Sequence, residues 1–170
     1  MEKILYTTTA VNEDGLTGVA YTKGNGDKDF STQISSPRSA EAGTNPEQLF
    51  ALAYATCLNA SIEFVEKRMK LEHKSKVEVK IDLTLDSEGE GYLFHPSVFV
   101  AMPGRDEALA HEILEAAERQ CPVHKLLKGV TVPTVELSTA NEYCIVKSCN
   151  RGRRYSDSSH LRSLCSVDYT

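Results

Sequence analysis

Fifteen consecutive residues, 48–62, carry no charged side chain, and they are preceded by a helix start signal. Thr44 and Glu47 have the spacing of a capping box, and Pro46 falls in the first turn. The pattern predicts one long helix from Thr44 to about Lys70. Apolar side chains occupy nearly all sides of this helix, namely Leu49, Phe50, Leu52, Ala53, Tyr54, Cys57, Leu58, Ala60, Ile62, Phe64 and Val65. Such a helix must be buried on several sides, and one small domain can hardly surround it, so we expect a homodimer.

The remaining pattern indicates strands before the helix and a strand–helix mixture after it. Short stretches rich in Thr, Val and Tyr predict strands over residues 4–11, 18–23 and 28–35. Strict alternation predicts a strand over 77–85, followed by a second over 92–102. Asp106 is a plausible cap for a helix to residue 120, residues 122–127 begin a short helix that Gly129 ends, and 130–137 form a closing strand.

Composition excludes several classes of protein. The net charge is −5, whereas a nucleic-acid-binding surface would need a clustered basic face. The uncharged stretch is shorter than the ~20 residues of a membrane span, and no signal peptide is recognisable, so we expect a cytoplasmic protein without membrane association. Residues 1–138 are expected to form one domain. Residues 139–170, rich in Ser and Arg, are expected to be a poorly ordered or non-native extension.

Five cysteines are too few, and odd in number, for a secreted disulfide scaffold. Cys57 lies on the apolar face of the long helix, where it could be a small hydrophobic core residue or a reactive thiol. Cys121 precedes Pro122, which places it at the start of the short helix, where free N–H groups favour a thiolate. From the residues alone, both the reactive and the structural interpretation of this pair stay open.

Three further polar residues have alternative interpretations. Arg38 is either a solvated loop residue or a cation that stabilises a thiolate and binds an anionic or peroxidic oxygen. Glu47 caps the helix, and could also hold Arg38 through a bidentate pair. His124 lies three residues after Cys121, but no further ligands complete a zinc site, so we expect no metal and interpret it as a surface residue that could modulate Cys121.

Taken together, these motifs resemble the OsmC/Ohr family of osmotically inducible and organic hydroperoxide resistance proteins. The resemblance covers residues 1 to about 138. It rests on the run from Gly43 to Ala51, on Tyr54-Ala55-Thr56-Cys57, and on Cys121-Pro122-Val123. The second cysteine motif looks like the OsmC version, because the Tyr-Ser continuation of the Ohr branch is missing.

The resemblance implies an α+β fold in which antiparallel sheets wrap around long central helices of an intertwined homodimer. It also implies a cysteine-based peroxidase that reduces organic hydroperoxides without a cofactor, as an antioxidant in the oxidative stress response. Cys57 would be the peroxidatic thiolate and Cys121 would form a disulfide with its sulfenic acid. An external dithiol, of lipoyl type, would then reduce this disulfide.

Glu47 matches the glutamate of the family, and Arg38 stands where the OsmC branch places its arginine, upstream of Thr44-Asn45-Pro46-Glu47. The Ohr branch has this arginine in the first hairpin, where the chain reads Gly15-Leu16-Thr17-Gly18. Ten residues of continuous helix would separate Glu47 from Cys57 by about 15 Å. We therefore expect Arg38 and Glu47 to serve the Cys57 of the partner subunit.

Two other functions remain open from the sequence. A redox sensor or ligand-binding dimer would form the same disulfide but turn over slowly with any dithiol. A structural protein with inert buried cysteines would have thiol pKa values at or above the ~8.5 reference.

Overall fold

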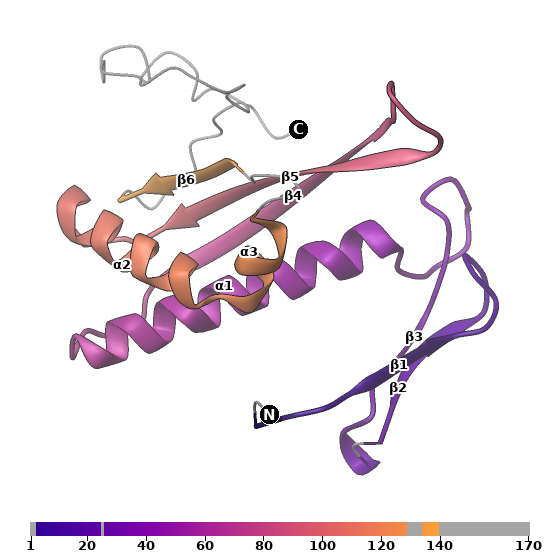
Figure 1. Cartoon of the computed structure of the whole chain (residues 1–170), viewed down its shortest axis with the longest axis horizontal. Coiled ribbons are helices and arrows are strands. Elements are labelled where there is room, and N and C mark those ends of the chain that lie inside the picture. Colours follow the sequence, from indigo (N-terminus) through magenta and orange to yellow (C-terminus); the bar gives the residue numbers. More distant parts are fainter. Residues whose placement is uncertain (1–2, 25, 129–133, 140–170) are drawn as a thin grey trace. The chain divides into compact units, whose positions relative to one another are not determined.

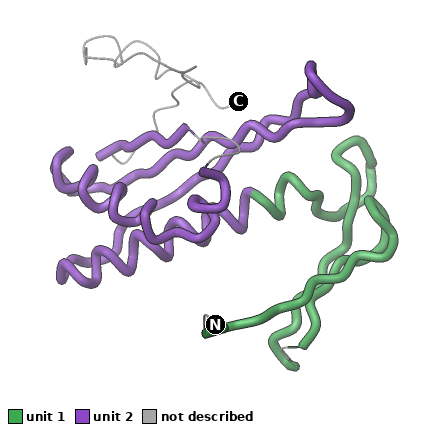
Figure 2. Tube along the Cα trace, viewed as in Figure 1, with its two compact units in different colours: residues 1–50 green, residues 51–170 purple. Residues whose placement is uncertain are grey.

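The structure is a computed structural model that describes residues 3–24, 26–128 and 134–139. The chain falls into two compact units, residues 1–50 and 51–170, which Figure 2 distinguishes by colour. The predicted C-terminal extension lies outside the described residues except for residue 139.

The first unit contains one antiparallel sheet of three short strands, β1 (Thr9–Asn12), β2 (Val19–Lys23) and β3 (Ser31–Gln33). β1 and β3 are shorter than predicted. A 3-10 turn, η1 (Gly26–Lys28), occupies the start of the third predicted strand, with Gly26 at a φ of 61°. Apolar side chains of this unit stay largely in solvent, including Ile4, Leu5, Tyr6 and Phe30.

The long helix α1 spans Pro46–Arg68, and its N-terminal cap differs by one residue from the prediction. Asn45, not Thr44, is the cap, since its side-chain Oδ1 accepts the N–H of Gln48 at 2.9 Å. The Thr44 hydroxyl instead donates to Oε1 of Gln48 at 2.9 Å. The predicted Thr44–Glu47 capping box is therefore wrong. Asn and Thr are both good caps, and only Asn45 leaves Pro46 at the first helical position.

The second unit contains the clearest predicted strands, β4 (Lys76–Leu85) and β5 (Tyr92–Ala101), as an antiparallel pair. The third strand, β6 (Thr134–Ser138), runs parallel to β5, so this sheet is mixed and not wholly antiparallel as expected. Between β5 and β6 lie α2 (Glu107–Gln120) and α3 (Pro122–Leu127). A helical crossover of this length returns the chain in the parallel direction.

The core of the molecule lies in the second unit, where α1 and α2 pack on the same sheet (Figure 1). The buried residues of α1 are spaced by three or four positions, which places them on one face of the helix. The buried residues of α2 follow the same helical spacing, and those of β5 include alternate positions of the strand. The buried members are Tyr54, Leu58, Ile62, Val65, Val98, Val100, Met102, Ala110, Ile113, Leu114, Ala117 and Cys121. This packing fixes the position of α1 against the turn between α2 and α3.

Candidate active site

Two cysteines that lie 64 residues apart in the sequence meet in the second unit. Cys57 sits on α1 beside the core residues Tyr54 and Leu58. Cys121 ends α2 and caps α3, with its backbone extended at φ −63° and ψ 114° because Pro122 follows it. The two Sγ atoms are 3.2 Å apart, and both thiols are free.

The two thiols differ in their access to solvent. Cys121 is completely buried, whereas Cys57 is half-buried. A small solute can therefore reach Cys57 first, and Cys121 stands directly behind it. A disulfide needs a sulfur–sulfur distance of about 2.05 Å, so closing the bond requires only a small local movement.

Burial dominates the pKa of Cys121. Burial, with a smaller contribution from the adjacent Cys57, raises the pKa of this thiol from 9.0 to about 11. The N–H of His124 donates to the Sγ at 3.4 Å and acts in the opposite direction, as predicted for a helix start. The helix effect is smaller than the cost of burial, so the expected preference of Cys121 for the thiolate is wrong and the thiol is neutral at pH 7.

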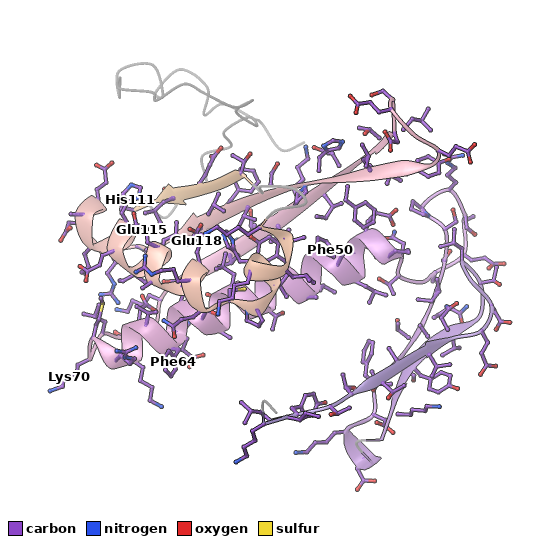
Figure 3. All side chains as sticks on the ribbon, in the orientation of Figure 1. Phe50, Phe64, Lys70, His111, Glu115 and Glu118 are labelled. Atoms are coloured by element: carbon purple, nitrogen blue, oxygen red, sulfur yellow. The ribbon has the colours of Figure 1, made fainter. Side chains whose placement is uncertain are left out.

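A buried tyrosine and a histidine complete the surroundings of the thiols. The Tyr54 hydroxyl lies 2.9 Å from Nδ1 of His124, and Tyr54 is fully buried. Burial, followed by the nearby Cys121, Glu118 and Cys57, raises the pKa of Tyr54, so its hydroxyl remains protonated. Glu118, labelled on α2 in Figure 3, is half-buried, which raises its pKa, while the neighbouring His124 lowers it.

Sequence reasoning assigned no role to Tyr54 and interpreted His124 as a surface residue that could modulate Cys121. A common spacing connects the two, because Tyr54 precedes Cys57 by three residues and His124 follows Cys121 by three. On a helix this spacing brings side chains to one face. The spacing could have indicated that both residues border the thiol pair.

Arg38 and Glu47 belong to the first unit and are not joined to each other in the described part of this chain. Arg38 is exposed in the loop between β3 and α1. Glu47 is half-buried, and its Oε2 atom is buried without a hydrogen-bond partner among the described residues. α1 continues without interruption from Pro46 to Arg68, so Glu47 and Cys57 stay ten residues apart on one helix. Within the described ranges, no group of three His, Cys, Asp or Glu side chains could hold a metal ion.

Comparison with known families identifies the family of this chain. Residues 38–136 match the family model of OsmC-like proteins, a range that contains Arg38, Glu47, Cys57 and Cys121. The chain belongs to the OsmC-like family. The expected family and α+β fold are thus confirmed.

Several OsmC-like relatives are named organic hydroperoxide resistance proteins. OhrB of Bacillus subtilis is 33% identical over 100 residues, which cover 59% of this chain and 74% of OhrB. The protein of that name from Xanthomonas axonopodis pv. citri is 30% identical over 141 residues, covering 81% and 97% of the two chains. The crystal structure of the Bacillus subtilis OhrB has a TM-score of 0.70 at 31% identity, covering 79% of this chain and all of its own. The organic hydroperoxide resistance protein OsmC from Legionella pneumophila has a TM-score of 0.72 at 26% identity, covering 80% and 99%.

Proposed function

We propose that this protein is a thiol peroxidase that reduces organic hydroperoxides to alcohols. The observation that carries the proposal is the pair of free thiols at 3.2 Å, one accessible and one buried behind it. The names of the relatives support a hydroperoxide as the substrate. Their membership of the same family supports a role in resistance to oxidative stress.

The proposed reaction has three steps. Cys57, as its thiolate, attacks the distal oxygen of ROOH, the O–O bond breaks, and the alkoxide takes a proton to leave as ROH. Cys121 then attacks the sulfur of the Cys57 sulfenic acid, which forms the disulfide and releases water. An external dithiol, for which a lipoyl group is our candidate, reduces the disulfide and becomes a disulfide itself.

Unequal burial supports the division of roles between the cysteines. The peroxidatic sulfur must meet the substrate, which suits the half-buried Cys57. Cys121, with a pKa of about 11, stays a neutral thiol and is protected from peroxide until Cys57 is oxidised. Apolar neighbours of Cys57 would favour organic hydroperoxides over hydrogen peroxide, since an alkyl group buried there contributes ~25 cal/mol per Å².

The active form is proposed to be a homodimer in which Arg38 and Glu47 serve the Cys57 of the partner. On α1 the side chains of Leu52 and Phe64 are 62% and 52% exposed. A hollow of about 350 Å³ beside α1 is lined by Ala55, Thr56, Asn59, Ala60, Glu63 and Val77. The Oδ1 atom of Asn59 is buried there without a hydrogen-bond partner among the described residues. A second copy packed on this side of α1 would bury the apolar side chains of Leu52 and Phe64. It could also offer a hydrogen-bond donor to Oδ1 of Asn59.

Length and composition alone would also allow α1 to cross a membrane, since its mean hydropathy reaches 1.2 over 18 residues. The core helix of a soluble protein satisfies the same criterion. We favour the dimer because one face of α1 already packs into a protein core through Tyr54, Leu58, Ile62 and Val65.

Two single substitutions test the chemistry. Each would be made in a chain that also carries Cys144→Ser, Cys149→Ser and Cys165→Ser, so that only the thiol pair remains. We expect Cys57→Ser to abolish the consumption of cumene hydroperoxide. Cys121→Ser should allow one turnover and then accumulate sulfinic acid at Cys57, visible as a gain of two oxygen atoms in the intact mass.

The parent protein should lose two hydrogen atoms in mass after one equivalent of peroxide, and digestion should locate the bridge at Cys57 and Cys121. Consumption of peroxide by Cys57→Ser at the parental rate would disprove the proposal. Formation of the bridge without turnover by any dithiol would identify a redox sensor instead of an enzyme.

A further inference from the structure

A closed ring of contacts joins α1 to α3 around the thiol pair. From α1, Cys57 touches Cys121 at 3.2 Å and the Tyr54 hydroxyl lies 2.9 Å from the His124 ring. From α3, the backbone N–H of His124 donates to Cys121 at 3.4 Å. His124 thus contacts the resolving sulfur through its backbone and the helix of the peroxidatic cysteine through its side chain.

Little else holds α3 in place within the described residues. The helix has six residues, none of which is fully buried, and Leu126 is 76% exposed. Among the described residues, the apolar contacts of α3 with the core come from the partly buried Val123 and Leu127. A helix this short is not stable by itself, so its position depends on these contacts. The hydroxyl of Tyr54 is enclosed in the core, where its hydrogen bond to His124 is costly to lose.

We propose that the Tyr54–His124 hydrogen bond positions Cys121 for disulfide formation and thereby sets the rate of the resolving step. Tyr54 and His124 are positioning residues in this proposal, because they act through Cys121. The inference rests on the proposed function, in which Cys121 closes a bond to an oxidised Cys57. In that step the S–S bond forms, the S–O bond of the sulfenic acid breaks, and the thiol proton leaves with the hydroxyl group as water.

The geometry of this step is demanding, which is why a single hydrogen bond can matter. A displacement of about 1 Å can cost a reaction about a hundredfold in rate. Loss of one hydrogen bond of typical strength corresponds to about a tenfold change. We therefore expect the closure of the disulfide to slow by about tenfold or more without this hydrogen bond, while the first attack by Cys57 stays nearly unchanged.

Closure can be measured without peroxide, which separates this inference from the proposed function. One equivalent of the aromatic disulfide dithiobis(nitrobenzoate) reacts with Cys57 to give a mixed disulfide and one thionitrobenzoate anion. Cys121 then displaces the second thionitrobenzoate and releases its proton. The two phases of yellow colour report attack by Cys57 and closure by Cys121 in turn. All proteins would carry serine in place of Cys144, Cys149 and Cys165.

Four variants define the outcome. Tyr54→Phe and His124→Leu should slow the second phase about tenfold or more and change the first phase less than about twofold. His124→Asn, whose side-chain amide can take the place of Nδ1, should restore much of the second phase. Tyr92→Phe, which removes an exposed hydroxyl on β5, is the matched control and should leave both phases unchanged.

An unchanged second phase in Tyr54→Phe and His124→Leu would overturn the inference. Equal slowing of both phases, with no recovery in His124→Asn, would also overturn it, since that result indicates general loosening of the fold. A failure of the proposed function gives a different result, namely normal closure in this assay but no consumption of organic hydroperoxide by the parent protein.

Discussion

At the scale of single residues, the burial of Cys121 links the chemistry of the site to stability. Its thiol has a pKa of about 11 in the native protein against 9.0 for an unperturbed thiol. Between these two pH values the native state holds more protons than the unfolded state, so the free energy of unfolding decreases as the pH rises. Below about pH 9 the contribution of the neutral thiol is fully present.

We therefore expect Cys121 to contribute on the order of 2 kcal/mol less to the free energy of unfolding at pH 11 than at pH 8. The measurement is urea denaturation of the reduced protein and of Cys121→Ala at both pH values. Groups that titrate in this range away from Cys121 cancel in the difference between the two proteins. A difference that is the same at both pH values would contradict the prediction.

At the scale of elements, a buried carboxylate ties the C-terminal end of α1 to two loops. Glu66 is fully buried and accepts from Ser75 at 3.0 Å, while its other oxygen lies 2.6 Å from Nδ1 of His73. Arg105, which also donates to the carbonyl of Glu72, approaches Glu66 at 3.4 Å. The Glu66 carboxylate therefore joins the end of α1 to the segment before β4 and to the turn after β5.

Glu66→Gln should lower the free energy of unfolding by roughly 2–3 kcal/mol, because it leaves the Arg105 charge partly buried without a counter-charge. The matched control is Glu78→Gln on β4, which breaks an exposed ion pair of 2.7 Å with Lys76. A surface pair of this kind contributes about 0–1 kcal/mol. Equal losses in the two variants, measured by urea denaturation, would show that the buried cluster adds nothing.

The elements also show which parts of the structure were accessible from the sequence. Local signals were sufficient to predict α1, β4 and β5, since periodicity depends on neighbours in the chain. They also predicted the cap of α2, where Oδ1 of Asp106 accepts the N–H of Leu109 at 2.9 Å. The Asn45 cap was missed because Thr44 satisfies the same rule one residue earlier. The Glu66 cluster was missed because its partner Arg105 lies 39 residues away, and no local pattern reports such a contact.

The geometry of the thiol pair was also not accessible from local sequence patterns. Composition and spacing left Cys57 and Cys121 open between core and reactive residues, and only the family resemblance paired them. The distance of 3.2 Å and the unequal burial arise from the packing of α1 against the α2–α3 turn, which is a tertiary property. The same packing raises the pKa of Cys121, whereas its place at a helix start acts in the opposite direction.

At the scale of the whole molecule, exposed apolar side chains support the proposed homodimer. Exposed large apolar residues occur in both units, on β2, α1, β4, β5 and α3, at Val19, Leu52, Phe64, Leu83, Leu85, Tyr92, Leu93 and Leu126. Figure 3 labels Phe64, whose ring also lies 5.9 Å from the guanidinium of Arg68. A partner copy would remove such surface from water, and a two-fold symmetric dimer would contain two equivalent sites.

The proposed sharing of sites between subunits makes a prediction that only a dimer can satisfy. Cys57→Ser and Arg38→Ala should each reduce turnover of organic hydroperoxide to below about 1% of the parent, since one lacks the nucleophile and the other a charge that stabilises the transition state. Mixed by unfolding and refolding, they should regain about a quarter of the parental rate. Half of the dimers are then mixed, and each of these has one site with both Cys57 and the partner's Arg38.

The control is a mixture of Cys57→Ser with Cys57→Ser,Arg38→Ala, which has no nucleophile and should stay inactive. If Arg38 acted on the Cys57 of its own chain, every site in the mixed dimer of single variants would lack one of the two residues. Activity would then not exceed that of the separate variants. Recovery to about a quarter would instead place both subunits in each site. It would also explain how Glu47 and Cys57 can take part in one reaction although ten residues of unbroken helix separate them within one chain.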